Sequence, residues 1–206
     1  MHVIDLYTWK TPNGRKISIM LEECGLDYTA HMVDLRKGKE LAPEFIAINP
    51  DGKIPVIVDR NGPAGVPYTL VESGAILMYL AEKTGRFMPA DMAGRYEVVQ
   101  WLMFQMAGIG PIFGQLHHYY RVAPAPVPYT IERFDTEARR AYGLLDRHFA
   151  EHEYLARELS IADFSTFPWI ARHEWHRVSL VDYPNVTRWY EMLWQRPAVQ
   201  RGMIPD

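Results

Sequence analysis

The chain has 206 residues, of which 48% are hydrophobic, 13% aromatic and 23% charged. This composition is typical of a globular protein and excludes a disordered, collagen-like or low-complexity chain. The 22 basic and 25 acidic residues give a formal net charge of −3, so we expect no nucleic-acid partner and no membrane partner. Because Cys24 is the single cysteine and residues 1–7 lack the basic start of a signal peptide, we expect a cytoplasmic protein.

Short strand and helix patterns alternate in the first half of the sequence. Val3–Tyr7 is an apolar run that predicts a strand, and Thr8–Gly14 is a loop rich in turn formers. Apolar residues at i, i+3, i+4 and i+7 then predict a helix that ends at Gly25, with Cys24 on its inward face. Tyr28–Leu35 predicts a second strand.

A short helix is predicted over Lys37–Ile48, followed by a hairpin. The hairpin consists of two β-rich runs, Ile54–Asp59 and Tyr68–Val71, which flank glycine and proline residues. Ser73 is a good N-cap for a helix that ends at Gly85.

Beyond residue 91 the patterns are helical throughout. Two long apolar stripes, over residues 99–106 and 134–149, predict core helices that the proline-rich segment Ala123–Pro128 connects. Glycines and a proline near residue 110 are expected to kink or end the first, and Ser160 with Asp163 has the spacing of a capping box. The change in pattern predicts two domains, at residues 1–86 and 91–206.

A strand, a turn-rich loop, a helix N-terminus and a hairpin entered through Ile-Pro form the pattern of a thioredoxin-like domain. The segments Thr11–Gly14, Asn49–Pro55 and Glu72–Ile76, with an all-helical second half, resemble the glutathione S-transferase superfamily. Thr11–Gly14, Gly114–His118 and Pro128–Arg133 are similar to its bacterial nu class, the glutathione-dependent disulfide-bond oxidoreductases. The resemblance implies an α/β thioredoxin-like N-terminal domain, an all-α C-terminal domain and a homodimer.

Glutathione has an amine, a thiol and two carboxylates, and each needs its own partner. Glu72 suits the γ-glutamyl ammonium, while the Ser73 hydroxyl and the N–H groups of a helix start suit its α-carboxylate. The alternative is that Ser73 only caps the helix and does not bind ligand. On the family pattern, Arg133 holds a carboxylate in two hydrogen bonds, whereas its alternative is a solvated charge on a helix.

The resemblance assigns the rest of glutathione to a loop and a cis proline. It implies that Ile54 precedes a cis Pro55 and pairs its main chain with the cysteinyl residue, although an ordinary edge-strand proline is the alternative. Lys53 is placed to meet the glycyl carboxylate. Glu40 stands where the nu class prefers an amide, and a carboxylate there repels the ligand unless it is protonated, turned away or bridged by a lysine.

The reacting atom is a thiol, whose free pKa of about 8.5 leaves a few per cent of thiolate at neutral pH. Thr11 and Asn13, at a helix N-terminus, are the natural hydrogen-bond donors that lower this pKa. Tyr7 is a competing donor, because several transferase classes use a tyrosine near the end of the first strand. Cys24 is far along the helix and is expected to act as a small hydrophobe, so the attacking sulfur belongs to bound glutathione.

Three functions remain open at this stage. The first is a glutathione-dependent disulfide oxidoreductase whose partners are glutathione, as co-substrate, and a small or protein disulfide. The second is a transferase that conjugates glutathione to an electrophile, and the third is a non-catalytic glutathione-binding module. No metal is expected, because the pairs His148/His152 and His173/His176 lack a third ligand.

Overall fold

The computed structural model describes residues 3–204, which divide into two compact units. The first unit contains the described residues of 1–86 and 196–206, and the second is Phe87–Gln195. The expected second domain ran to residue 206, whereas the structure groups the last segment with the first unit. No helix in residues 3–204 is long and apolar enough to cross a membrane.

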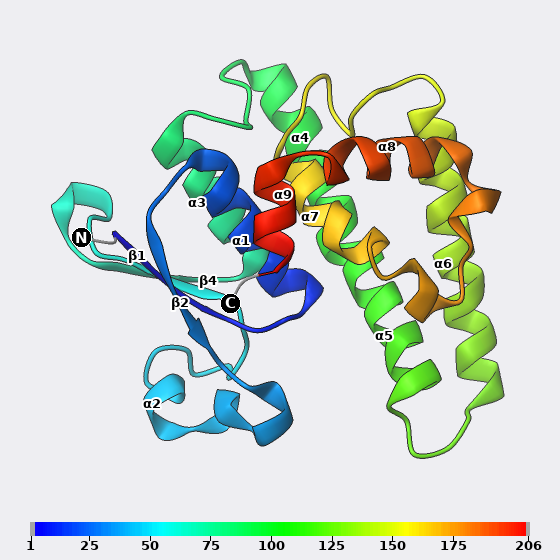
Figure 1. The fold of residues 1–206 in the computed structure, drawn as a ribbon, viewed down its shortest axis with the longest axis horizontal. Helices are drawn as coiled ribbons and strands as arrows, with labels where there is room; N and C mark the ends of the chain where they lie inside the picture. Colours follow the sequence, from blue (N-terminus) through cyan, green and yellow to red (C-terminus); the bar gives the residue numbers. More distant parts are fainter. Residues whose placement is uncertain (1–2, 205–206) are drawn as a thin grey trace. The chain divides into compact units, whose positions relative to one another are not determined.

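A four-stranded mixed sheet forms the centre of the first unit (Figure 1). Its strands are β1 (Ile4–Thr8), β2 (Tyr28–Met32), β3 (Val56–Asp59) and β4 (Tyr68–Val71), in the order β2-β1-β3-β4. β1 runs parallel to β2 and antiparallel to β3, which pairs antiparallel with β4. This topology confirms the expected thioredoxin-like sheet, including the hairpin.

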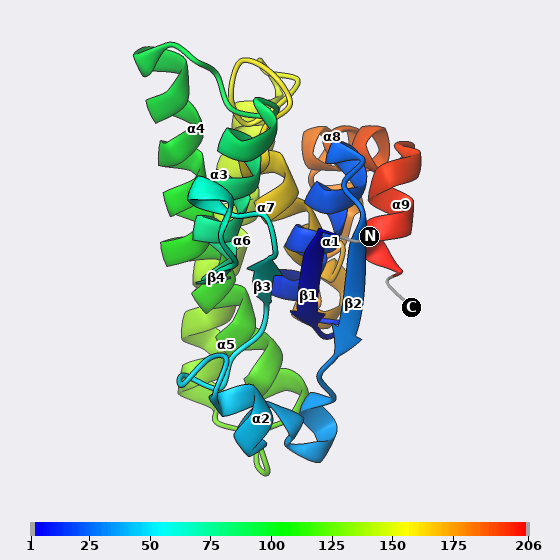
Figure 2. The same cartoon turned by 90° about the vertical axis from the view of Figure 1, so that its left-hand side faces the viewer.

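The two faces of the sheet bury different residues, because side chains alternate along a strand. Ile4, Leu6 and Ile57 share one face and are almost completely buried. The opposite face carries Tyr7 and Val56, which pack in a cluster with Phe45 of α2. Figure 1 shows α1 and α2 on opposite sides of the sheet, and Figure 2 gives the view turned by 90°.

Three helices of the first unit illustrate how local sequence fixes their ends. α1 (Pro12–Cys24) ends at Gly25, which has φ 65° as the sequence predicted. The helix expected over Lys37–Ile48 is instead two short 3₁₀ turns followed by α2 (Pro43–Ile46), because Gly38 takes a left-handed conformation between the turns. α3 (Ser73–Thr84) has Glu72 as its N-cap, so the N-cap assignment of Ser73 is wrong and Ser73 is the first helical residue.

The second unit is all-helical, as the sequence predicted. Its core is aromatic and includes the buried side chains of Phe113, Tyr142 and Trp189. Where glycines and a proline were expected to kink or end a helix, the chain forms a π-helical turn at Gln105–Ile109 and continues. The α-helices of this unit are α4 (Met92–Phe104), α5 (Gly110–Arg121), α6 (Pro128–Phe149), α7 (Ile161–Ile170) and α8 (Pro184–Trp194).

The last helix, α9 (Pro197–Met203), packs on α1 within the first unit. The Ser18 hydroxyl donates a hydrogen bond to the Gly202 carbonyl, and Arg196 forms two hydrogen bonds with Glu23 at 2.6 and 2.7 Å. These contacts explain why the C-terminal segment belongs to the first unit.

Gly202→Ala is expected to lower the free energy of unfolding by about 2 kcal/mol, since the added methyl group would collide with the Ile19 backbone. Urea denaturation measures the change. Gly143→Ala on α6 is the matched control: its methyl group meets only Arg147 at 3.6 Å, so this variant is expected to be as stable as the wild type or more stable. Equal stability of the two variants would contradict the close packing of α9 on α1.

Candidate functional site

The N-terminus of α1 presents the two side chains expected to act on a thiol. Thr11 is the N-cap, with φ −110°, and its Oγ1 accepts a hydrogen bond of 3.1 Å from the Gly14 N–H. Because a hydroxyl both accepts and donates, Thr11 keeps its O–H hydrogen for a second partner. Thr11 and Asn13 are both partly exposed at a helix end that carries partial positive charge. The geometry therefore suits the stabilisation of an anion.

The loop before β3 holds a cis peptide between Ile54 and Pro55, in agreement with the expectation. Asn49, only 5% exposed, organises this loop from within. Its Nδ2 donates to the Lys53 carbonyl at 2.8 Å, and its Oδ1 accepts from the Asp51 N–H at 3.2 Å. Sequence reasoning did not single out Asn49, although it begins the Asn-Pro-Asp-Gly-Lys-Ile-Pro segment.

Lys53 belongs to this loop, and Glu40 lies against it. The ammonium of Lys53 is exposed and lies 2.8 Å from Asp51 Oδ2, and this hydrogen bond raises the pKa of Lys53. The Glu40 carbonyl lies 3.2 Å from the position that a Cβ of Gly52 would take, which places Glu40 against the loop. One Glu40 carboxylate oxygen is buried and has no hydrogen-bond partner within residues 3–204. Glu40 is thus turned partly into the protein.

Glu72 and Ser73 occupy the junction between β4 and α3. Glu72 is exposed and has φ 68° and ψ 112°, a conformation that is strained for a non-glycine residue. Ser73 is 3% exposed and lies in the first turn of α3, where main-chain N–H groups lack intrahelical acceptors. The junction therefore places an acid, a hydroxyl and helix-start donors next to one another.

A residue that sequence reasoning missed lies behind this junction. Lys16 on α1 is 1% exposed, and its ammonium donates a hydrogen bond of 3.2 Å to Ser73 Oγ. Burial lowers the pKa of Lys16 to about 7, while the charge of Glu72 opposes this shift. The signal in the sequence was weak, because a lysine in an amphipathic helix is normally exposed.

The remaining candidates are Arg133, Tyr7 and Cys24. Arg133 is exposed on α6 in the second unit. The Tyr7 ring stacks on His31 with 4.7 Å between centroids and packs against Phe45, which favours a structural role over catalysis. Cys24 is only half-buried: its sulfur lies 3.5 Å from Thr84 Oγ1, and burial raises the pKa of its thiol.

Comparison with known families places both units. The model of the glutathione S-transferase N-terminal domain matches residues 11–83, and the model of the C-terminal domain matches residues 113–197. The disulfide-bond oxidoreductase YfcG of Escherichia coli is 44% identical over 204 residues, which cover 98% of this chain and 95% of YfcG. The chain belongs to the glutathione S-transferase family.

Other members of the glutathione S-transferase family agree in sequence and fold. The Escherichia coli disulfide-bond oxidoreductase YghU is 38% identical over 218 residues, covering 98% of this chain and 75% of YghU. A family member from Pseudomonas fluorescens, crystallised with two glutathione molecules, has a TM-score of 0.94 and 43% identity, covering 98% of this chain and 92% of its own. A transferase from Pseudomonas putida, crystallised with glutathione disulfide, has a TM-score of 0.93 and 45% identity, covering 100% and 93% of the two chains. The resemblance seen in the sequence is confirmed.

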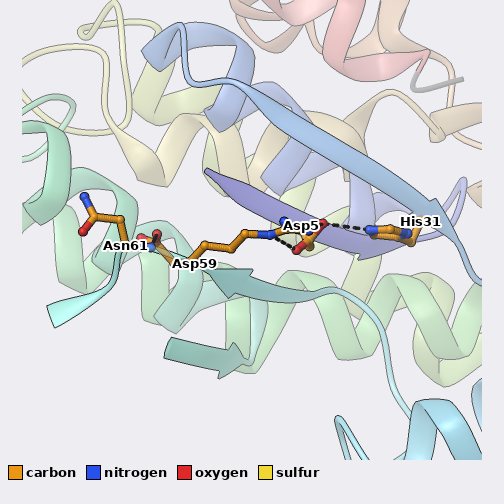
Figure 3. Close-up of polar contacts among 5 residues, drawn as sticks. Asp5, His31, Asp59 and Asn61 are labelled. Carbon is orange, nitrogen blue, oxygen red and sulfur yellow. Dashed lines mark hydrogen bonds and ion pairs between the residues drawn. The ribbon is translucent and has the colours of Figure 1, made fainter. Parts of the chain in front are cut away.

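In this glutathione S-transferase, a charged network lies on the sheet (Figure 3). Asp5 on β1 is 7% exposed and accepts hydrogen bonds from Arg60 at 2.8 and 3.1 Å. The ring nitrogen Nε2 of His31 lies 2.9 Å from Asp5 Oδ1. The hydrogen bond from Arg60, with a smaller contribution from His31, holds the pKa of Asp5 below its usual value of 3.8.

Asp5→Asn is expected to reveal this network through the pH dependence of stability. Because the folded pKa of Asp5 is lowered, its contribution is present above pH 3.8 and is lost as pH falls through the folded pKa. The difference in unfolding free energy between wild type and Asp5→Asn should therefore shrink between pH 6 and pH 3 in urea titrations. A difference that stays constant over this range would contradict the ionic role of Asp5.

The histidine pairs do not form a metal site in the described residues. No group of three or more potential ligands gathers within residues 3–204. The rings of His148 and His152 stack on each other at 4.2 Å, and the Nδ1 of His173 lies 2.9 Å from the Val178 carbonyl. These contacts give the histidines structural partners.

Proposed function

We propose that the chain is a glutathione-dependent disulfide oxidoreductase in which the thiol of bound glutathione is the nucleophile. The observation that carries the proposal is the N-terminus of α1, where Thr11 and Asn13 stand and no cysteine is present. Cys24 lies at the opposite end of the same helix, half-buried and with a raised thiol pKa, which disfavours its reactive thiolate form.

The proposed reaction proceeds by two thiol–disulfide exchanges. A glutathione thiolate attacks one sulfur of the substrate disulfide, forms a mixed disulfide and releases the other sulfur as a thiolate, which takes up a proton. A second glutathione thiolate attacks the glutathione sulfur of the mixed disulfide, which yields glutathione disulfide and the second substrate thiol. Two glutathiones are thus oxidised for each disulfide reduced.

The protein promotes the reaction by favouring the thiolate. Lowering the pKa of the glutathione thiol by roughly two units requires about 2.7 kcal/mol. The Thr11 hydroxyl, the Asn13 amide and the helix N-terminus supply hydrogen bonds and positive potential of this order.

The other candidate residues fit the remaining groups of glutathione. Exposed Glu72 faces solvent where it can pair with the γ-glutamyl ammonium, and Ser73 with the start of α3 suits the α-carboxylate. The main chain of Ile54, next to cis Pro55, pairs with the cysteinyl residue. Lys53 attracts the glycyl carboxylate beside Glu40, and the family resemblance assigns a carboxylate of glutathione to the Arg133 guanidinium. The relatives crystallised with two glutathiones or glutathione disulfide support a site of this size.

Calorimetric titration with glutathione disulfide and with glutathione tests the proposal. A site built for two tripeptides should bind the disulfide at least tenfold more tightly than the reduced form. Equal or weaker binding of the disulfide, without glutathione-dependent reduction of a small disulfide, would contradict disulfide chemistry.

Conjugation of glutathione to an electrophilic carbon is the second candidate. It is favoured by the family models and by the transferase relatives from Pseudomonas. The same thiolate would attack carbon in place of sulfur. Turnover of an electrophile such as 1-chloro-2,4-dinitrobenzene at a rate above that of disulfide reduction would support it.

We further propose that the chain is a cytoplasmic homodimer of the nu class. The nu-class assignment is supported by the two oxidoreductase relatives from Escherichia coli and by the Thr-Pro-Asn-Gly loop. Light scattering coupled to gel filtration is expected to give twice the chain mass of 23.9 kDa.

A further inference from the structure

The burial of Lys16 is unusual for a lysine. Only 1% of Lys16 is exposed to solvent, although lysine side chains normally keep their ammonium in water. Burying a charge is costly unless the charge is paired and hydrogen-bonded. The side chain reaches from α1 to the start of α3, where it donates to Ser73 Oγ over 3.2 Å.

The direction of this hydrogen bond has a chemical consequence. A protonated lysine has donors and no acceptor, so it makes the Ser73 oxygen an acceptor and directs the hydroxyl hydrogen to another atom. A neutral amine could accept from the same hydroxyl and reverse the bond. The protonated form of Lys16 therefore leaves the Ser73 hydroxyl to donate to an anion, whereas the neutral form can itself accept that hydrogen.

The elements packed around Lys16 carry other charged side chains. The charge of Glu72, the residue before Ser73, acts on Lys16 and favours its protonated form. Arg196, the N-cap of α9, pairs with Glu23, and Arg201 of α9 pairs with Glu22. On the remaining packed elements, Lys83 of α3 pairs with Asp59 at the end of β3, and Asp5 of β1 pairs with Arg60 and His31.

We propose that Lys16 is a positioning residue of the γ-glutamyl subsite, which holds the Ser73 hydroxyl in its donating orientation and supplies positive charge to the ligand's α-carboxylate. The inference rests on the proposed function, since it requires that glutathione bind at Glu72 and Ser73. It makes the subsite selective for γ-glutamyl compounds that retain this carboxylate.

Binding is then expected to be coupled to proton uptake. With its pKa near 7, Lys16 is mostly neutral at pH 8, and an anion one hydroxyl away stabilises its protonated form. Binding of S-methylglutathione, which has no ionisable thiol, should take up a substantial fraction of a proton at pH 8. Calorimetry in buffers of different ionisation enthalpy measures this uptake.

The decisive test is a cycle of one substitution and one ligand change. The variant is Lys16→Met, which keeps an unbranched side chain one atom shorter than lysine and removes its charge. The ligands are S-methylglutathione and the same tripeptide with 4-aminobutyrate in place of the γ-glutamyl residue, which lacks only the α-carboxylate. We expect Lys16→Met to weaken the binding of S-methylglutathione about tenfold or more. The same substitution should weaken the binding of the 4-aminobutyryl analogue less than about twofold. Lys37→Met, at an exposed position of the same unit, is the matched control and should leave both affinities within about twofold.

The outcomes separate the role of Lys16 from the proposed function. If Lys16→Met lost the same affinity for both ligands, or if Lys16→Met and Lys37→Met lost the same affinity, the role of Lys16 would be overturned and the proposed function would stand. Failure of the wild type to bind S-methylglutathione or glutathione disulfide would overturn both. If Lys16→Met does not fold, the wild-type proton uptake decides: equal uptake with the two ligands would overturn the inference.

Discussion

Asp163→Ala is expected to lower the free energy of unfolding by about 3 kcal/mol or more. The Asp163 carboxylate is completely buried and accepts hydrogen bonds from the Leu155 and Ser160 N–H groups and from Trp189 Nε1, each at 3.0 Å. Alanine would leave three buried donors without this partner, at about 1 to 3 kcal/mol each. The substitution also removes the capping box of α7.

The pH dependence of this effect has a defined sign. Burial raises the pKa of Asp163 to about 6, against the opposing effect of its hydrogen bonds. The folded protein therefore holds a proton that the unfolded chain releases near pH 3.8, and the stability that Asp163 contributes falls as pH rises from about 4 through 6. The difference in unfolding free energy between wild type and Asp163→Ala should narrow over this range.

Asp135→Ala provides a matched control in the same unit. Asp135 lies on α6 and forms an i,i+4 ion pair of 2.7 Å with Arg139, whose side chain is 46% exposed. Such a surface pair contributes about 0.5 kcal/mol or less. Urea denaturation of the two variants would contradict the account if Asp163→Ala were no less stable than Asp135→Ala.

Thr11→Val is expected to lower kcat/KM for glutathione-dependent disulfide reduction by about 100-fold. Valine keeps the shape of threonine but removes the hydroxyl donor, and the loss of one donor to a developing or bound anion has effects of this order. The same change removes the N-cap of α1 and costs about 1 kcal/mol of stability. Initial rates are therefore measured where circular dichroism shows the variant to be folded.

Thr11→Ser separates the two roles of the hydroxyl. Serine keeps both the donor and the N-cap, so the rate is expected to stay within about threefold of wild type. Asn13→Ala should lower the rate about tenfold, because the helix N-terminus and Thr11 remain. Wild-type rates in Thr11→Val would assign thiolate stabilisation elsewhere, with Tyr7 as the first alternative.

Much of the fold could be predicted because its signals are local. The capping box at Ser160 and Asp163 and the left-handed Gly25 depend on a few neighbouring residues and a fixed backbone geometry. The two-domain architecture follows from the change to purely helical patterns after residue 91. The cis Ile54–Pro55 bond followed from the family resemblance, since no local pattern distinguishes a cis proline from an edge-strand proline.

The features that escaped prediction depend on contacts between distant segments. Lys16 is buried because α3 brings Ser73 to its ammonium, 57 residues away in the sequence. The grouping of α9 with the first unit depends on Ser18 and Gly202, 184 residues apart. The predicted N-cap of α3 was wrong by one residue, because Glu72 has a positive φ, which the sequence does not predict for a non-glycine residue.

The central claim is that both reacting sulfurs come from ligands, and Cys24→Ala tests it most directly because the variant contains no cysteine. Glutathione-dependent reduction of a small disulfide is measured after circular dichroism has shown that the fold matches wild type. The account predicts turnover near the wild-type rate, with Thr11 and Asn13 as the groups that control it. Loss of turnover in the folded variant, with activity in wild type, would contradict the account and make Cys24 the nucleophile.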